Sequence, residues 1–211
     1  MLNFSNQDKC IIHFDRALKT LFGGLTATEA NPSCKIEQPK LTPQDQRISA
    51  ALMRVNHTGE ICAQALYQAQ SIAANNYELS TKLKQAADEE VNHLIWTQER
   101  ITQLGGHTSY LGPIWYIGSL TLGYIAAVCG DNWSLGFIAE TEYQVIQHLE
   151  DYMQKLPGND YASHTIMQAM RDDEMQHAEE AISDGATELP AFIKSGMKSL
   201  ADIMKAIAFK I

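Results

Sequence analysis

Two short segments of this chain place a glutamate three residues before a histidine, Glu90-Val-Asn-His93 and Glu174-Met-Gln-His177. Residues three apart lie on one face of a helix, so each pair would project a carboxylate and an imidazole toward the same point. Such a pair offers an oxygen and a nitrogen ligand to a metal ion. One Glu-x-x-His alone is weak evidence, because the chain's 14 Glu and 7 His should give about half of one match by chance.

A repeat in the spacing makes the two motifs more informative. Glu60 lies 30 residues before Glu90, and Glu142 lies 32 residues before Glu174. In two antiparallel helices of this length, residues about thirty apart reach similar heights, so two such pairs in one bundle would gather four carboxylates and two imidazoles. That is the ligand set of the ferritin-like di-iron and di-manganese proteins. The predicted metal ligands are Glu60, Glu90, His93, Glu142, Glu174 and His177.

The candidate ligands fall on the apolar stripes of their helices. Glu90, for example, lies at helical spacing from Leu83, Leu94 and Ile101. Four ionised carboxylates in such a core would be very unfavourable unless cations neutralised them. Oxygen and imidazole ligands without a thiolate favour iron or manganese over copper or structural zinc. The alternative is that the helix faces are assigned wrongly and all six side chains are solvated, as we expect for Glu89, Glu140 and Glu179.

The helices that must position these residues follow from apolar periodicity and from helix-end signals. Thr42 suits an N-cap with Pro43 in the first helical position, Asn75-Asn76 suit a turn, and Asn159 could cap a later helix. The expected helices cover 6–22, 42–74, 78–104, 133–156 and 159–184, with a linker at 24–41. We therefore predict an all-α fold, a four-helix bundle with a crossover apolar helix and extra N- and C-terminal helices. The N-terminal helix and linker would form 1–41, and the bundle domain 42–211.

Two further segments are unusual in charge. Residues 108–130 contain no Asp, Glu, Lys or Arg, but the apolar part from Ile114 to Cys129 is shorter than the ~20 residues of a membrane span. After Pro190, four lysines oppose a single aspartate, Asp202, in an amphipathic pattern. A basic amphipathic helix suits an anionic bilayer surface. The other interpretation is that both segments only pack against the bundle.

Composition excludes several classes of function. The net charge of −9 argues against a general nucleic-acid-binding protein, since phosphates need a basic surface. The four cysteines form no Cys-x-x-Cys pair, which argues against a thiolate zinc site and a disulfide framework and favours a reducing compartment. The first residues lack the pattern of a secretory signal, so we expect the cytoplasm. No glycine-rich phosphate loop is present, so a built-in nucleotide or flavin site is not expected.

Four strings around the candidate ligands resemble the demethoxyubiquinol hydroxylases of ubiquinone biosynthesis. They are Arg54-Val-Asn-His-Thr-Gly-Glu60, Asp88-Glu-Glu-Val-Asn-His93, Ala139-Glu-Thr-Glu142 and Arg171-Asp-Asp-Glu-Met-Gln-His177. The first string is specific to that family, whereas Glu-x-x-His is shared by all di-iron carboxylate bundles. The resemblance runs from about Arg47 to Asp184, with a weaker match at 14–22.

The resemblance implies O2-dependent hydroxylation of the ring of a 2-polyprenyl-3-methyl-6-methoxy-1,4-benzoquinol, a late step of ubiquinone biosynthesis. It implies two Fe ions per chain, one held by Glu60, Glu90 and His93 and the other completed by Glu142, Glu174 and His177, with two of the glutamates bridging. It also implies peripheral attachment to the cytoplasmic face of the cell membrane, where residues 108–130 and the basic terminal helix would form the interfacial surface. Other ubiquinone-biosynthesis proteins and a second copy of the chain stay open as partners.

A few residues near the ligands have open roles. His57 could orient a ligand carboxylate or hydrogen-bond locally, and His148 could lie beside the site or at the surface. The family's histidine after the third glutamate is present as His148, but Leu149 replaces the tyrosine that many members have next, which puts an electron-transfer role of that tyrosine in doubt. Gly59 inside a helix would be explained by close helix packing or by mere tolerance.

Three rival functions stay open. The first is iron oxidation and storage on the same bundle, although the uncharged stretch and basic terminal helix do not suit a hydrophilic shell. The second is another di-iron oxygenase, such as a tRNA hydroxylase, which the acidic charge disfavours. The third is a helical scaffold without metal.

Overall fold

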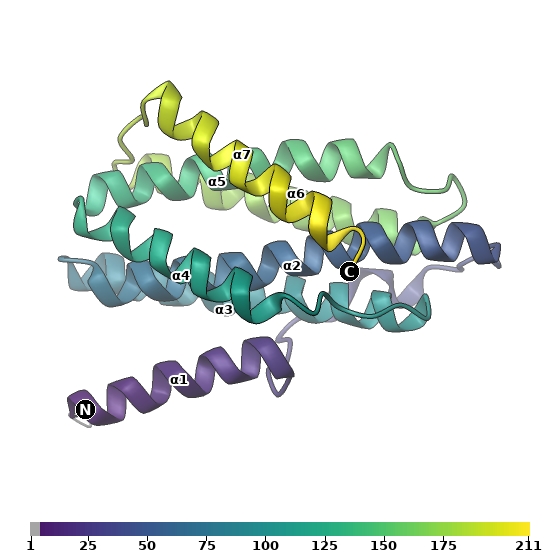
Figure 1. Cartoon of the computed structure of the whole chain (residues 1–211), viewed down its shortest axis with the longest axis horizontal. Helices are drawn as coiled ribbons and strands as arrows, with labels where there is room; N and C mark the ends of the chain where they lie inside the picture. Colours follow the sequence, from purple (N-terminus) through teal and green to yellow (C-terminus); the bar gives the residue numbers. More distant parts are fainter. Residues whose placement is uncertain (1–4) are drawn as a thin grey trace.

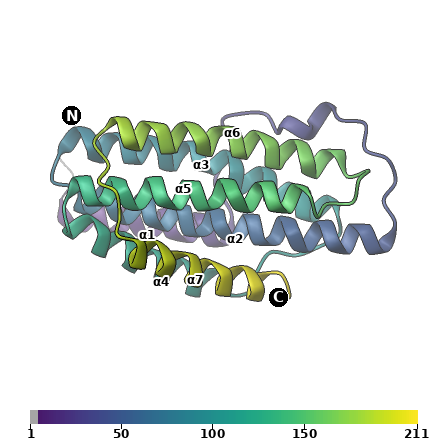
Figure 2. The ribbon, with the colours of Figure 1, turned by 90° about the horizontal axis from the view of Figure 1, so that it is seen from above.

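The computed structural model describes residues 5–211, which form an all-α fold (Figure 1). Four long helices, α2, α3, α5 and α6, lie side by side as a bundle, while α1 (Figure 1) and α7 (Figure 2) lie outside it. The crossover helix α4 joins α3 to α5 and packs along α2. The predicted fold class is confirmed. The helices are α1 Asn6–Phe22, α2 Pro43–Ala73, α3 Tyr77–Gln103, α4 Gly112–Val128, α5 Asp131–Met153, α6 Tyr161–Ser183 and α7 Ala191–Ala208, with a short 3-10 helix at Pro32–Lys35.

The helix ends show where local signals act. Thr42 caps α2 as predicted, because its side chain accepts a hydrogen bond from the Asp45 N–H at 3.2 Å. The prediction of Asn159 as the cap of α6 is wrong by one residue. Asp160 is the N-cap, and its Oδ1 accepts from the Ser163 N–H at 3.1 Å. Asp160 is held there by a tertiary partner, since its carboxylate pairs with the buried guanidinium of Arg100.

Helix α5 also differs from its predicted range of 133–156. It begins at Asp131 and ends at Met153, because the residues before Pro157 leave the helical path. Asp131 accepts hydrogen bonds from the backbone N–H groups of Asn75 and Asn76, at 3.0 and 3.2 Å. The start of α5 is therefore tied to the turn between α2 and α3, and the two helix pairs of the bundle are joined at this end.

Two glycines in the helices have opposite surroundings. A Cβ atom on Gly123 of α4 would lie 2.8 Å from the Leu66 carbonyl oxygen of α2, so only glycine permits this close approach of the two helices. A Cβ atom on Gly59 of α2 would meet nothing within 4 Å. Close packing therefore does not explain Gly59, and that interpretation is wrong.

We expect alanine at these two positions to change stability in opposite directions. Gly59→Ala should raise the free energy of unfolding by about 0.5–1 kcal/mol through helix propensity. Gly123→Ala should lower it by about 1–3 kcal/mol, because the added methyl group forces α4 away from the backbone of α2. Urea unfolding of both variants and the parent protein measures the two changes, and equal effects at the two sites would contradict the packing described.

The outer faces of α4 and α7 carry apolar side chains in contact with solvent. On α4, Ile114 and Ile117 are exposed by 61% and 63%, and on α7, Phe192 and Ile203 are exposed by 74% and 54%. The two helices lie on the same side of the bundle (Figure 2) and line one cavity. Within residues 5–211, no helix combines the length and the apolar character needed to cross a bilayer.

Candidate metal centre

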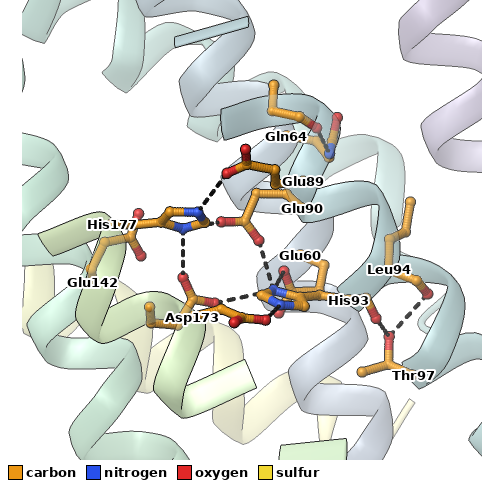
Figure 3. A network of polar contacts seen from close by, with 12 residues as sticks. Glu60, Gln64, Glu89, Glu90, His93, Leu94, Thr97, Glu142, Asp173 and His177 are labelled. Atoms are coloured by element: carbon orange, nitrogen blue, oxygen red, sulfur yellow. Dashed lines mark hydrogen bonds and ion pairs between the residues drawn. The ribbon is translucent and has the colours of Figure 1, made fainter. Parts of the chain in front are cut away.

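The six predicted ligands come together in the interior of the bundle. Glu60 extends from α2, Glu142 from α5, and the two Glu-x-x-His pairs from α3 and α6 (Figure 3). All six side chains are buried, with Glu90 fully enclosed. They form two overlapping groups whose ligand atoms lie within 4.8 Å of one another, one made of Glu60, Glu90, His93 and Glu174 and the other of Glu90, Glu142, Glu174 and His177. The alternative in which these residues are solvated is excluded.

Glu90 and Glu174 lie between the two imidazoles. His93 Nδ1 is 3.0 Å from Glu90 Oε2 and 3.4 Å from Glu174 Oε1. On the other side, His177 Nδ1 is 3.0 Å from Glu90 Oε1 and 3.4 Å from Glu174 Oε2. Each of the two carboxylates therefore offers one oxygen to each side of the centre. Glu60 and Glu142 take the outer positions, one in each group.

The far nitrogen of each imidazole faces a second carboxylate. His93 Nε2 lies 2.9 Å from Asp173 Oδ2, and His177 Nε2 lies 3.2 Å from Glu89 Oε2 (Figure 3). A carboxylate at this place holds a proton on Nε2, so Nδ1 is the nitrogen that faces the centre and that a cation could bind. The expectation that Glu89 is only a solvated charge is therefore wrong, although about half of its side chain is exposed.

Sequence reasoning missed Asp173 altogether, although a signal for it was present. An acidic residue directly precedes the glutamate of both Glu-x-x-His motifs, Glu89 before Glu90 and Asp173 before Glu174. The pairing is crossed, because the acidic residue of each motif serves the histidine of the other motif. Only the packing of α3 against α6 brings these residues within reach of each other.

The electrostatics of the cluster favour positive charge at its centre. Burial, and then nearby carboxylates, raise the pKa values of Glu60 and Glu142 well above the usual range. Burial alone would raise the pKa of Glu90 as well, but the charges of His93 and His177 and the hydrogen bond with His93 hold it well below its usual value. Burial opposes charge on His177, whereas its glutamate partners raise its pKa to about 12. Protons on the imidazoles supply positive charge here, and metal cations can supply it equally.

The chemistry of the ligand atoms fits hard or borderline divalent cations. All six ligands offer carboxylate oxygen or imidazole nitrogen, and none of the chain's cysteines belongs to either group. Glu90 Oε1 has no well-aligned hydrogen bond despite its close approach to His177 Nδ1, so a lone pair of this buried oxygen is available. On the outer side, the Tyr67 hydroxyl donates to Glu142 Oε1 at 2.7 Å and fixes that carboxylate. Each of the two groups could hold a metal ion.

An apolar cavity of about 280 Å³ leads to this centre. It lies between α2, α4, α5 and α7, and three of the candidate ligands, Glu60, Glu142 and Glu174, form part of its wall. The rest of the wall is mostly aliphatic and aromatic. The cavity therefore gives a small apolar molecule a route from the α4–α7 face to the carboxylates.

The two histidines with open roles are not bound to a ligand carboxylate. His148 is half-buried in the cavity wall, and its Nε2 lies 3.0 Å from Asn56 Oδ1. His57 is buried, but its Nδ1 has no hydrogen-bond partner among the described residues, so neither local bonding nor an orienting role is seen for this atom. Burial lowers the pKa of His57 to about 4, which keeps the imidazole neutral.

The neutral His57 should make stability depend on pH. In the unfolded chain His57 binds a proton at about pH 6.5, whereas in the folded chain it does so only near pH 4. Stability from this residue is therefore present above pH 6.5 and is lost as the pH falls toward 4. Between pH 7 and pH 5 we expect the parent protein to lose about 2 kcal/mol more than His57→Gln does. Denaturant unfolding at both pH values measures the difference, and identical pH profiles would contradict it.

The fold and the centre define a helical-bundle protein whose buried glutamates and histidines can hold metal ions. Comparison with known proteins narrows this class. The family model described as "Ubiquinone biosynthesis protein COQ7" matches residues 47–208, and the chain belongs to this family.

Several curated relatives are similar over nearly the whole chain. A protein of Aromatoleum aromaticum named 3-demethoxyubiquinol 3-hydroxylase is 47% identical over 204 residues, which cover 97% of this chain and 99% of the relative. Proteins of the same name from Nitrosococcus oceani and Nitrosomonas europaea are 45% and 48% identical, each with at least 97% of both chains covered.

Proposed function

We propose that this chain hydroxylates the ring of a demethoxyubiquinol, the 2-polyprenyl-3-methyl-6-methoxy-1,4-benzoquinol, with O2 at a centre of two iron ions. The observation that carries the proposal is the meeting of two features, a buried carboxylate and imidazole cluster and an apolar cavity that ends on it. The names of the relatives supply the substrate. The step belongs to the late part of ubiquinone biosynthesis.

The two overlapping groups suggest how the ions are shared. One iron would be held by Glu60 and His93 and the other by Glu142 and His177, with Glu90 and Glu174 bridging the pair. Iron supplies activation of O2 when bound. The protein's own contribution is geometric: Asp173 and Glu89 hold the Nε2 protons, and Tyr67 fixes Glu142 through its hydroxyl. Leu149, where many members have tyrosine, is fully buried in the core and offers no redox-active group.

The apolar cavity suits the ring and its tail. Aliphatic walls exclude water from the reacting carbon and favour the ring over hydrated molecules. The cavity is bounded by α4 and α7, whose outer faces are apolar, so the tail could leave the protein directly into lipid. We accordingly place the protein at the cytoplasmic face of the cell membrane, attached from one side.

Membrane attachment through α4 and α7 can be measured directly. We expect the purified protein to co-sediment with liposomes that contain anionic lipid, and the bound fraction should fall with salt because Lys198 and Lys210 of the C-terminal segment contribute charge. Replacement of the exposed Ile114 and Ile117 with Ser should weaken binding about tenfold or more, through loss of buried apolar area. The control is serine at Tyr161 and Ile182, which are exposed on α6, the helix on the side of the bundle opposite α7 (Figure 2). No association at any salt concentration would contradict the proposal.

Quinone profiling tests the activity itself. Cells that lack this protein should accumulate the demethoxy precursor and lose ubiquinone, and the intact gene should restore the product. The rival storage function predicts a normal quinone profile together with a large closed shell, which light scattering would detect. A normal profile in the deficient cells would therefore end the hydroxylase proposal.

A further inference from the structure

Several polar groups in the wall of the cavity are engaged within the protein. The Thr141 hydroxyl donates to a carbonyl of its own helix at 2.8 Å, and Gln144 Nε2 donates to a glutamate side chain at 2.7 Å. Lys205 pairs with an aspartate on α7 at 2.7 Å. The Thr141 hydroxyl and the Gln144 amide therefore cannot donate to a ligand without breaking an existing contact.

Two N–H donors in the wall have no partner within residues 5–211. They are Asn56 Nδ2 on α2 and Trp115 Nε1 on α4, and both atoms are buried. His148 Nε2 donates to the other atom of the Asn56 amide, Oδ1, at 3.0 Å, and this contact turns the NH2 group away from His148. Buried donors without acceptors are unfavourable, so each is suited to a ligand that brings an acceptor.

The two residues that carry these donors line one cavity. Asn56 lies one helical turn before Glu60 on α2, so an oxygen bound to its amide lies close to the metal ligands. Trp115 contributes from the α4 wall of the same cavity. The carboxylates at the end of the cavity can only accept hydrogen bonds when ionised. A matching ligand is therefore a flat apolar molecule with at least two acceptor oxygens.

We propose that Asn56 and Trp115 bind two different oxygens of the benzoquinol ring and so select which ring carbon faces the metal centre. The inference rests on the proposed function for the nature of the ligand. His148 is a positioning residue in this arrangement, because it acts on the ring only through the Asn56 amide. Specificity for the oxygen pattern of the ring follows, since an analogue without one of these oxygens leaves a buried donor unpaired.

Binding of short-tailed quinols to the purified full-length protein tests the inference. Isothermal titration calorimetry would compare the parent with Trp115→Phe, which removes the indole N–H together with the five-membered ring that carries it, and with Asn56→Leu. We expect each variant to bind the complete ring about threefold to tenfold more weakly, the contribution of one hydrogen bond between neutral groups. Thr165→Val on α6 is the matched control, because its hydroxyl also donates to a carbonyl of its own helix but the residue lies outside the cavity, and the affinity should be unchanged.

Ring analogues that each lack a single oxygen show whether a variant binds more weakly because it has lost a hydrogen bond to the ring or because it packs less well against the ring. The loss caused by Trp115→Phe should vanish for one analogue, and the loss caused by Asn56→Leu for a different one. Equal losses on every analogue, or no loss on any, would overturn the inference while the hydroxylase proposal stands, provided that the parent binds and converts the complete ring. If the parent protein binds none of the quinols, both the inference and the proposed function fail.

Discussion

Glu174→Ala should remove metal from both positions of the centre and abolish hydroxylation. Glu174 belongs to both groups of ligands and lies 3.4 Å from the Nδ1 atom of each histidine, so its loss opens both sites at once. Changes to residues outside the ligand shell already cost about 10–100-fold in metal affinity or activity, and loss of a shared ligand should cost more. Metal analysis by mass spectrometry and a quinol hydroxylation assay measure the two effects.

Controls on the same helix show whether the effect belongs to the centre. Glu179→Ala changes an exposed glutamate of α6 and should leave metal content and turnover unchanged. Asp173→Asn removes the charge beside His93 but no predicted ligand, so it should give an intermediate loss of about 10–100-fold. Two irons per chain and full activity in Glu174→Ala would refute the assignment of the bridging carboxylate.

The largest loss of stability is expected from Asp160→Ala. Asp160 and Arg100 form a buried ion pair at 2.6 Å, with side-chain exposures of 0% and 5%. Removal of the carboxylate leaves a buried guanidinium without its counter-charge, which costs about 3–5 kcal/mol. The same change removes the N-cap of α6. Thermal and urea unfolding would measure the loss, which should appear as a shift in midpoint without a change in the number of transitions.

A double substitution distinguishes the unpaired charge from the missing cap. Arg100→Met combined with Asp160→Ala removes both charges, so most of the loss should be recovered and only about 1 kcal/mol for the cap should remain. Asp160→Asn keeps the capping oxygen and should fall between the parent and Asp160→Ala. If the double variant is as unstable as Asp160→Ala alone, the buried ion pair is not the source of the effect.

Most of what the sequence predicted about the fold and the site came from short-range patterns. The spacing of Glu60, Glu90, Glu142 and Glu174 predicted the bundle and the cluster, because helical periodicity and short turns fix both the face and the height of a residue. What could not be predicted depends on contacts between distant helices. The crossed pairing of Asp173 with His93 and the capping role of Asp160 both need the packed bundle, in which α3 meets α6.

The cavity also could not be predicted from the sequence. Its walls come from five helices, and the two unpartnered donors can be recognised only once every neighbouring polar contact is known. Gly59 and Gly123 make the same point, since both are helix-interior glycines in the sequence and only the structure shows that one faces open space and the other a carbonyl.

The crossed carboxylates have a consequence for folding. The chain from 42 to 104 and the chain from 131 to 184 each hold half of the ligands, yet each half lacks the acid that orients its own imidazole. An isolated helix pair would thus offer iron a loose and weak site. Iron should therefore stabilise the docked arrangement of the two halves. We expect iron to bind only after the halves have docked, and a chelator that removes the iron should weaken the contact between the halves before either helix pair unfolds.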